Sequence, residues 1–318
     1  MKQILFAYPL PAECYEPYQN EFSFTVSDHI LTPEEIAERV PGFDACMVAG
    51  NIVTPAAIDR GDKLKAIGNL GVGYDNIDWQ YATKKGIAVV NTPTQVTETT
   101  AEHAVALMMA TMRGVLHFDR QLRAGQWGAD LFPKENMELH GKTLGIMGFG
   151  RIGKFVCKKA QGLGMNVVYY DAFRATPEIE KEYDVTYLEM DELLKVSDCI
   201  TLHIPYTPEN HHLFNKETFA KMKPGAYLIN AARGPVVDEA ALVEALKDGT
   251  LGGAGLDVFE EEPKVHPGLL ELDNVVLTPH IASAIRQTRM NMATESLSGV
   301  MGVLRGEKPV NVINKQVL

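Results

Sequence analysis

A glycine-rich segment in the middle of the chain constrains the fold more than any other feature. It reads Thr-Leu-Gly-Ile-Met-Gly-Phe-Gly-Arg-Ile-Gly, and Gly148, Gly150 and Gly153 stand in G-x-G-x-x-G spacing. A short apolar run precedes these glycines and a helical pattern follows them, as in the first strand-to-helix turn of a dinucleotide-binding unit. In such a turn, Gly148 permits the sharp bend and Gly150 admits a pyrophosphate to the helix N-terminus. Gly153 lets helix and strand pack closely.

The residues after the glycines extend this pattern. A predicted helix covers residues 151–163, and the next apolar run, 166–170, leads directly into Asp171. An acid about 20 residues beyond the glycines is the expected ligand of the ribose hydroxyls. Its charge would repel a 2′-phosphate, which favours NAD over NADP. Arg174 leaves the alternative open, because an arginine there could reach a phosphate.

Alternating strand and helix patterns predict two α/β units. From the glycine loop onward, apolar runs recur at 143–149, 166–171, 199–205, 226–232, 253–259 and 274–280. Six such runs suit a doubly wound parallel sheet of the Rossmann type. An earlier set at 4–8, 44–50, 66–71 and 87–91 predicts a smaller α/β unit. A largely buried helix at 100–112 would link the two units, and a last helix at about 284–304 would return the chain to the first.

Length, composition and net charge argue against several classes of protein. The length of 318 residues suggests about two domains, and no apolar run approaches the ~20 residues of a membrane span. The N-terminus lacks the apolar stretch of a signal peptide, and the four cysteines show no metal-ligand spacing, so free thiols in a reducing cytoplasm and no metal site are expected. The formal net charge of −11 argues against a nucleic-acid surface.

Three polar residues follow neighbouring strands in the second half of the chain. Arg233, Glu262 and His280 each come shortly after an apolar run that is typical of a buried strand. The carboxyl ends of parallel strands share one edge of a sheet, so the three side chains should converge there. Arginine clamps carboxylates, and a carboxylate beside histidine favours the protonated imidazole. Together they could move a proton on an anionic carbonyl or hydroxy compound.

Each of these three residues also has a plainer interpretation, as a capping arginine, a solvated acid or a loop histidine. Their common sheet edge is what separates them from other residues of the same kinds. A structural role is expected for His103 on the buried helix, and a solvated one for His211 and His212 in a polar loop. No supporting context is found for His117, His140 and His266.

The chain resembles the D-isomer-specific 2-hydroxyacid dehydrogenases over essentially its whole length. Four blocks carry the resemblance: Asn-Leu-Gly-Val-Gly-Tyr-Asp-Asn-Ile-Asp at 69–78, the glycine loop with Asp171, Asn-Ala-Ala-Arg-Gly at 230–234, and 255–263 together with Thr-Pro-His-Ile-Ala-Ser at 278–283. The resemblance implies that Arg233, Glu262 and His280 form the catalytic triad. It selects Glu262, which directly precedes Pro263, rather than the two glutamates before it.

The resemblance also implies an organisation. Residues 1–99 and 285–318 would form a flavodoxin-like substrate domain, into which a Rossmann NAD-binding domain of residues 100–284 is inserted. The substrate domain would close over the cofactor. A cytoplasmic homodimer is implied as well, with the helix that starts at Thr100 in its interface.

Two binding sites follow from the matched motifs. The substrate carboxylate would lie on the backbone amides of Leu70, Gly71, Val72 and Gly73, with Arg233 and His280 completing the site. The implied cofactor contacts are Thr100, Gly148, Gly150, Arg151, Ile152, Gly153, Asp171, His203, Ile204, Pro205, Thr207, Ala231, Ala232, Arg233, Asp257, His280 and Ser283.

The implied activity is hydride transfer between NADH and a small 2-oxo acid of the glyoxylate, hydroxypyruvate or 2-ketogluconate type. Phosphoglycerate dehydrogenase is an alternative, but residues 48–52 carry no cation and no regulatory domain follows Leu318. Formate dehydrogenases lack the glutamate partner. A phenylpyruvate or D-lactate-type reductase stays open, as does a different class, an NAD-sensing corepressor-like binding protein.

Overall fold

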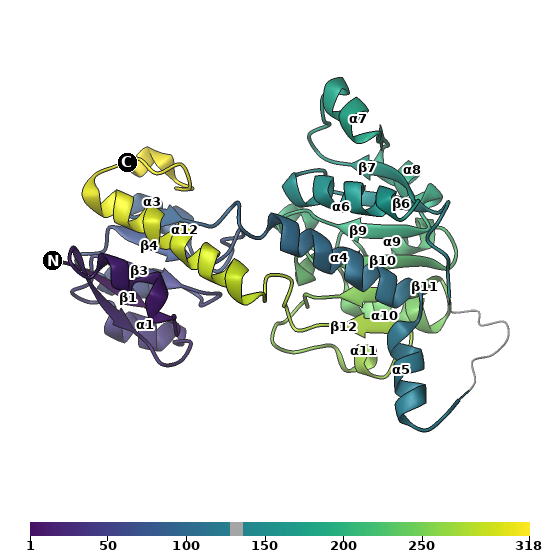
Figure 1. The fold of residues 1–318 in the computed structure, drawn as a ribbon, viewed down its shortest axis with the longest axis horizontal. Helices are drawn as coiled ribbons and strands as arrows, with labels where there is room; N and C mark the ends of the chain where they lie inside the picture. The colour runs from purple at the N-terminus through teal and green to yellow at the C-terminus, as the bar shows by residue number, and fades with distance from the viewer. Residues whose placement is uncertain (128–135) are drawn as a thin grey trace. The chain divides into compact units, whose positions relative to one another are not determined.

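The computed structural model describes residues 1–127 and 136–318, which form two compact units. Met1–Val96 and Ser283–Leu318 make the first unit, and Thr97–Ala282 make the second. Each unit has its own parallel sheet with helices packed on both faces (Figure 1). Among the described residues, no helix has the length and apolar character needed to cross a membrane.

The first unit contains a five-stranded sheet in the order β2-β1-β3-β4-β5. Its strands are β1 (Lys2–Phe6), β2 (Phe22–Val26), β3 (Ala45–Val48), β4 (Ala66–Asn69) and β5 (Ala88–Val90). Its helices are α1 (Pro33–Arg39), α2 (Pro55–Arg60), α3 (Trp79–Lys84) and α12 (Arg286–Arg305), with short 3₁₀ turns at Ala12–Cys14, Glu16–Tyr18 and Lys315–Val317. This strand order is the flavodoxin-like one.

Burial explains why the central strands of this unit are almost wholly apolar. Every residue of β3, β4 and β5 is buried. Helices α1, α2 and α3 cover one face of the sheet, and α12 covers the other. A parallel sheet covered on both faces requires continuous apolar runs rather than alternation, and such runs made these strands visible in the sequence.

The second unit contains a seven-stranded sheet in the order β12-β11-β10-β9-β6-β7-β8. Its strands are β6 (Thr143–Met147), β7 (Asn166–Tyr170), β8 (Thr186–Tyr187), β9 (Cys199–Leu202), β10 (Ala226–Asn230), β11 (Leu251–Leu256) and β12 (Val275–Leu277). Its helices are α4 (Thr97–Met112), α5 (Val115–Arg123), α6 (Arg151–Gly162), α7 (Pro177–Tyr183), α8 (Met190–Val196), α9 (Lys216–Lys221), α10 (Glu239–Lys247) and α11 (Pro267–Leu270), with 3₁₀ turns at Pro208–Asn210 and Gly234–Val236.

Strand order reverses between β6 and β9, which are neighbours in the sheet although two strands separate them in sequence. Helices α4 and α6 cover one face of the sheet, and α8, α9, α10 and α11 cover the other (Figure 1). Ligands of doubly wound folds bind outside the carboxyl ends of the strands at such a reversal. The glycine loop after β6 therefore occupies the position where a ligand is expected.

The predicted fold class is confirmed, with differences in detail. Each of the six predicted apolar runs of the second unit overlaps a strand, although β11 begins two residues before the run at 253–259. The seventh strand, β8, has only two residues, and it was missed because so short an edge strand leaves no apolar run. The predicted helix at 100–112 begins three residues earlier, at Thr97. A left-handed Gly114 then separates it from the amphipathic helix α5.

Candidate active site

The three candidate catalytic residues follow three adjacent strands of the second sheet. Arg233 lies beyond the end of β10, Glu262 beyond β11 and His280 beyond β12, and these strands are hydrogen-bonded neighbours. All three strands run in the same direction, so the side chains lie at one edge of the sheet. This arrangement agrees with the convergence expected from the sequence.

His280 and Glu262 form a hydrogen-bonded pair. The imidazole Nδ1 lies 2.8 Å from Glu262 Oε2. The other carboxylate oxygen, Oε1, accepts a bond of 3.1 Å from the backbone N–H of Phe259, which fixes the carboxylate. The side chains remain 50% and 37% exposed, respectively, so a small solute can reach them. Because Nδ1 is occupied, Nε2 is the atom of His280 that can exchange a proton with a substrate.

The local electrostatics favour a charged pair. The hydrogen bond that His280 donates to Glu262 raises the pKa of His280, although burial and the nearby Arg233 charge act in the opposite direction. Burial alone would raise the pKa of Glu262, but the bonds from His280 and Phe259 and the charges of His280 and Arg233 hold that pKa below its usual value. Arg233 is therefore close enough for its charge to act on both partners. An imidazolium beside a carboxylate is a proton donor that can act near neutral pH.

A buried aspartate holds the turn that carries His280. The backbone of His280 is left-handed, with φ of 51°, and its N–H donates to the Asp257 carbonyl at 2.7 Å. The Asp257 carboxylate is fully buried and accepts the backbone N–H groups of Ile281 at 2.8 Å and Ala282 at 2.9 Å. A residue other than glycine keeps a left-handed backbone only where contacts with its surroundings hold it in that conformation. The hydrogen bonds with Asp257 are such contacts.

Two further side chains contact the buried carboxylate of Asp257. His103 Nε2 on α4 lies 3.2 Å from Asp257 Oδ1, and the Thr278 hydroxyl donates to the same oxygen at 2.7 Å. Burial would raise the pKa of Asp257, but these bonds and the N–H of Ile281 lower it, so the carboxylate stays charged. The sequence suggested a structural role for His103 but gave no partner, because Asp257 lies 154 residues away.

Arg233 lies in a turn that is fixed from two sides. Asn230 accepts the N–H of Ala232 at 3.0 Å and donates its side-chain amide to the carbonyl of Arg233 at 2.9 Å. A Cβ added to Gly234 would collide with the backbone carbonyl of Phe259. The Arg233 turn and the segment that leads to Glu262 are thus in backbone contact, and only glycine fits between them.

The three glycines of the loop after β6 have different local environments. Gly148 has a φ of 96°, and a Cβ there would come within 2.6 Å of the His203 carbonyl. A Cβ at Gly153 would strike the Gly148 carbonyl. These two glycines are required by the fold itself. Gly150, at the N-cap of α6, faces open space, and a Cβ would meet no heavy atom within 4 Å. Close approach of an external group would explain a glycine there.

Asp171 is placed beside this loop. Its two carboxylate oxygens accept the N–H groups of Phe149 at 2.7 Å and Phe173 at 2.9 Å. A carboxylate offers about four lone-pair sites, so it can still accept from ribose hydroxyls. The first turn of α6 supplies N–H groups that have no partner within the helix. The open position at Gly150, this helix N-terminus and Asp171 together fit a dinucleotide.

Substituting Gly150 with alanine is expected to weaken NADH binding strongly with little effect on folding. The new methyl group meets no protein atom, so the fold tolerates it, but it would occupy space that a pyrophosphate needs. NADH dissociation constants from fluorescence titration, together with melting temperatures, would check this expectation.

Gly162 provides the matched control, because it lies in the same helix and a Cβ there also meets nothing within 4 Å. Gly162→Ala should keep NADH affinity and stabilise the protein by up to about 1 kcal/mol. Unchanged NADH affinity in Gly150→Ala would show that no ligand approaches that position.

The remaining residues that were predicted to contact the cofactor lie at several positions in the two units. His203, Ile204, Pro205 and Thr207 follow β9, and Ala231 and Ala232 follow β10, all near the strand ends of the second unit. Arg151 and Ile152 start α6, Thr100 is buried in α4, and Ser283 opens the returning part of the first unit. Burial lowers the pKa of His203 to about 4, so its imidazole is neutral.

The predicted substrate loop follows β4 in the first unit. The buried Asn69 donates its amide to the carbonyl of Gly73 at 2.6 Å, and the carbonyl of Gly71 accepts from Thr92 at 3.0 Å. Val72 is 37% exposed, and its carbonyl accepts from Asn91 at 2.9 Å. The loop thus directs its carbonyls into protein contacts, while no protein acceptor takes the N–H groups of Gly71, Val72 and Gly73 within the described chain. Unused N–H groups suit an anion.

Comparison with known proteins gives consistent findings. The model of the family "D-isomer specific 2-hydroxyacid dehydrogenase, NAD binding domain" matches residues 105–282. The chain is 40% identical over 324 residues to a glyoxylate reductase of Thermococcus onnurineus, covering 99% of this chain and 97% of that one. Its structure is similar to a glyoxylate reductase from Paecilomyes thermophila, with a TM-score of 0.89, 30% identity and 99% of each chain covered. It is also similar to a D-lactate dehydrogenase from Aquifex aeolicus complexed with NAD and lactic acid, with a TM-score of 0.87, 30% identity and coverage of 98% and 99%.

Proposed function

This chain belongs to the D-isomer-specific 2-hydroxyacid dehydrogenases, and we propose that within this family it reduces a small, unphosphorylated 2-oxo acid of the glyoxylate or hydroxypyruvate class. It is an oxidoreductase acting on D-2-hydroxy acids, with NAD as its cofactor. The observation that carries the proposal is the His280–Glu262 pair beside Arg233 at one sheet edge. The glyoxylate reductases among the relatives support the choice of substrate.

The proposed roles follow from the geometry. The bound reduced nicotinamide supplies hydride to the 2-oxo carbon. His280 donates the proton on its Nε2 to the developing alkoxide, and Glu262 stabilises the imidazolium beforehand. Arg233 polarises the carbonyl and holds the carboxylate through its guanidinium fork. In the reverse direction, neutral His280 accepts the hydroxyl proton of a D-2-hydroxy acid.

We assign the first unit to substrate binding and the second to the cofactor. The amides of Gly71, Val72 and Gly73 are proposed to bind the substrate carboxylate. The Leu70 N–H, which the sequence also suggested, is not available for this role because it donates to the Val48 carbonyl at 2.8 Å. Residues 48–52 offer no cation for a phosphate group, and Asn51 there is buried with its amide donated to Ala7 and Leu31 carbonyls. This segment therefore favours an unphosphorylated substrate.

Incubation with NADH and a panel of 2-oxo acids tests the proposed function, with the loss of nicotinamide absorbance as the readout. Glyoxylate or hydroxypyruvate should give the highest kcat/KM, above 2-ketogluconate, phenylpyruvate and pyruvate. In the reverse direction, D-glycerate but not L-glycerate should be oxidised. A preference for 3-phosphohydroxypyruvate would refute the substrate proposal. NADH binding without turnover of any acid would favour the corepressor-like alternative.

Preference for NADH over NADPH is expected from Asp171, whose carboxylate would repel a 2′-phosphate. The possible competitor, Arg174, is held by Glu180 through bonds of 2.8 and 3.0 Å and lies 4.9 Å from the centre of the Tyr187 ring. It is thus engaged away from a ribose phosphate. Comparing kcat/KM for the two cofactors measures the preference.

Asp171→Asn is the diagnostic variant for this preference. It removes the charge but keeps an oxygen that can accept a backbone N–H, so the ratio of kcat/KM for NADH to that for NADPH should fall. If the parent enzyme used NADPH equally well or better, Arg174 would have to leave Glu180 and override Asp171.

A homodimer is expected in solution, in line with the family. The sequence placed the helix that starts at Thr100 in its interface, but most apolar side chains of that helix, α4, are buried in the core of the second unit. We therefore propose that the following helix, α5, forms the interface. The helix α5 has no buried residue in the described chain, although it is amphipathic, and Val115 and Leu122 are more than half exposed. They stand seven residues apart and so lie on one face of the helix. Light scattering should give twice the 35.0 kDa mass of one chain.

Charged substitutions on the exposed face of α5 test whether this face forms the dimer interface. A double variant with glutamate at Val115 and Leu122 should dissociate toward monomers, whereas Ile30→Glu, at an exposed position of the first unit, should not. A parent protein that is monomeric at working concentration would exclude this part of the proposal.

A further inference from the structure

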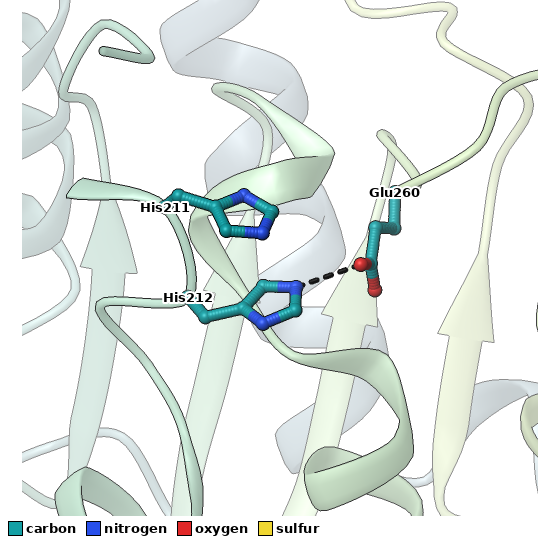
Figure 2. Close-up of side chains that lie close together, drawn as sticks. All are labelled: His211, His212 and Glu260. Carbon is teal, nitrogen blue, oxygen red and sulfur yellow. Dashed lines mark hydrogen bonds and ion pairs between the residues drawn. The ribbon is translucent and has the colours of Figure 1, made fainter. Parts of the chain in front are cut away.

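Two consecutive histidines and a glutamate form a cluster in the second unit that the proposed reaction does not use. His211 and His212 lie in the loop between β9 and α9, and Glu260 lies in the segment after β11. Figure 2 shows both imidazoles extending from their loop toward the Glu260 carboxylate. One ligand atom from each side chain lies within 4.8 Å of the others. Among the described residues, this is the only group of at least three histidine, cysteine or acidic side chains that meets this criterion.

The donor set suits a divalent transition-metal ion. Two imidazoles and one carboxylate are ligands that Zn²⁺ commonly takes, with water filling a fourth position. The two rings are stacked, with centroids 3.9 Å apart and planes 21° apart, so a metal ion held by both would require at least one imidazole to rotate out of the stack. His212 Nε2 now lies 2.7 Å from Glu260 Oε1, and a metal ion would replace the shared proton of that contact.

His211 has a ring nitrogen that can coordinate a metal ion. Its one side-chain hydrogen bond in the described chain is a long contact of 3.5 Å between Nδ1 and the Tyr206 hydroxyl. Its Nε2 has no protein partner there, and the residue is exposed. A ligand from solvent can therefore reach this nitrogen without displacing a protein contact.

The backbone that carries the cluster is held in place. Glu260 and the buried Glu239 exchange bonds, because each carboxylate accepts the backbone N–H of the other residue, at 3.4 and 2.7 Å. The N–H of His212 donates to the Pro235 carbonyl at 2.9 Å, and Asn215 donates its amide to the His212 carbonyl at 3.0 Å. Positions that are fixed before the metal arrives reduce the ordering cost of binding it.

Charge around the cluster also favours a cation. Glu260, Glu261 and Glu262 are consecutive, and the Glu261 side chain is 75% exposed. Acidic side chains next to a site raise the local concentration of cations. The four cysteines, which are stronger ligands for soft metals, are all buried and so do not compete.

We propose that His211, His212 and Glu260 bind one Zn²⁺-class divalent ion. The ion would join the loop between β9 and α9 to the segment that ends in Glu262, and thereby stabilise the second unit. The site is distinct from the proposed catalytic triad, and its occupation does not depend on the identity of the 2-oxo acid.

Titration calorimetry with ZnCl₂ in a chelator-free buffer tests this proposal on the whole protein. One ion should bind per chain, and Glu260→Gln and His211→Gln should each weaken binding at least about tenfold, since even outer-shell partners of metal sites contribute 10–100-fold. Glutamine at 260 keeps one oxygen that can accept the backbone N–H of Glu239, and residue 211 is exposed, so both variants should fold. Added ZnCl₂ should raise the melting temperature of the parent but not of Glu260→Gln.

His29 offers a matched control. It also contacts two carboxylates, Asp28 at 2.7 Å and Glu35 at 3.1 Å, but through opposite ring nitrogens, so the three groups do not converge on one point. His29→Asn should leave Zn²⁺ affinity unchanged. The proposal is overturned if the parent binds no Zn²⁺ at millimolar concentration, or if binding survives unchanged in both Glu260→Gln and His211→Gln.

Discussion

Replacing His280 with asparagine is expected to lower kcat for 2-oxo acid reduction by about 10²–10⁴-fold, the usual contribution of a general acid. NADH affinity should be nearly unchanged, since the glycine loop and Asp171 are untouched. Asparagine is the informative replacement because residue 280 has a left-handed backbone with φ of 51°, which asparagine tolerates better than most residues. The turn should therefore survive while the proton donor is lost. Stopped-flow reduction rates and NADH titrations would measure the two quantities separately.

Two comparisons make this result decisive. His280→Ala should lose activity to the same extent, but with a larger fall in melting temperature, because alanine is less tolerant of the left-handed region. His29→Asn removes another histidine that contacts carboxylates and should keep full activity. Reduction by His280→Asn at more than a tenth of the parent rate would show that another group supplies the proton.

The sequence predicted those parts of the molecule that depend on local pattern. Strands β3, β4 and β10 are wholly buried, so each appears as a short apolar run, which ends in a buried asparagine in β4 and β10. Gly148 and Gly153 mark a turn that excludes any side chain, and that requirement is visible as fixed spacing. The direction of parallel strands then brings Arg233, Glu262 and His280 to one edge without further information.

Other parts depend on contacts between residues far apart in the chain. Strand β2 carries exposed and half-exposed residues at the edge of its sheet, and its sequence therefore lacks a buried run. The contact of His103 with Asp257 and the backbone approach of Gly234 to Phe259 need the folded sheet before they exist. The left-handed backbone of His280 follows from the bonds that Asp257 makes with the turn after it.

The adjacent histidines at 211 and 212 illustrate the same limit. In sequence they stand in a polar loop, for which a solvated role is the natural expectation. Glu260 lies 48 residues beyond His212, and only the return of the chain through β10 and β11 brings it within 2.7 Å. No local spacing could have indicated this cluster, because Glu260 follows β11 whereas the two histidines follow β9.

Glu262→Gln is expected to lower kcat and also to move the pH dependence of both reaction directions. The Glu262 hydrogen bond is the largest cause of the raised pKa of His280, so removing the negative charge should lower that pKa. Reduction requires protonated His280 and should therefore fail at a lower pH than in the parent. Oxidation requires neutral His280, so its rising limb should begin at a lower pH. Glutamine can still accept the Phe259 N–H, which keeps the loop in place.

The measurement is kcat/KM against pH in both directions for the parent and for Glu262→Gln, because this quantity reports the free enzyme. The pH-dependent limbs of reduction and oxidation should both shift to lower pH, since His280 controls both. Glu261→Gln is the control, because Glu261 is an exposed neighbour whose side chain contacts Lys264 at 3.6 Å. Its profiles should coincide with those of the parent. If the profiles of Glu262→Gln only scale down without moving along the pH axis, Glu262 does not tune His280, and proton donation would have to be assigned to a different group.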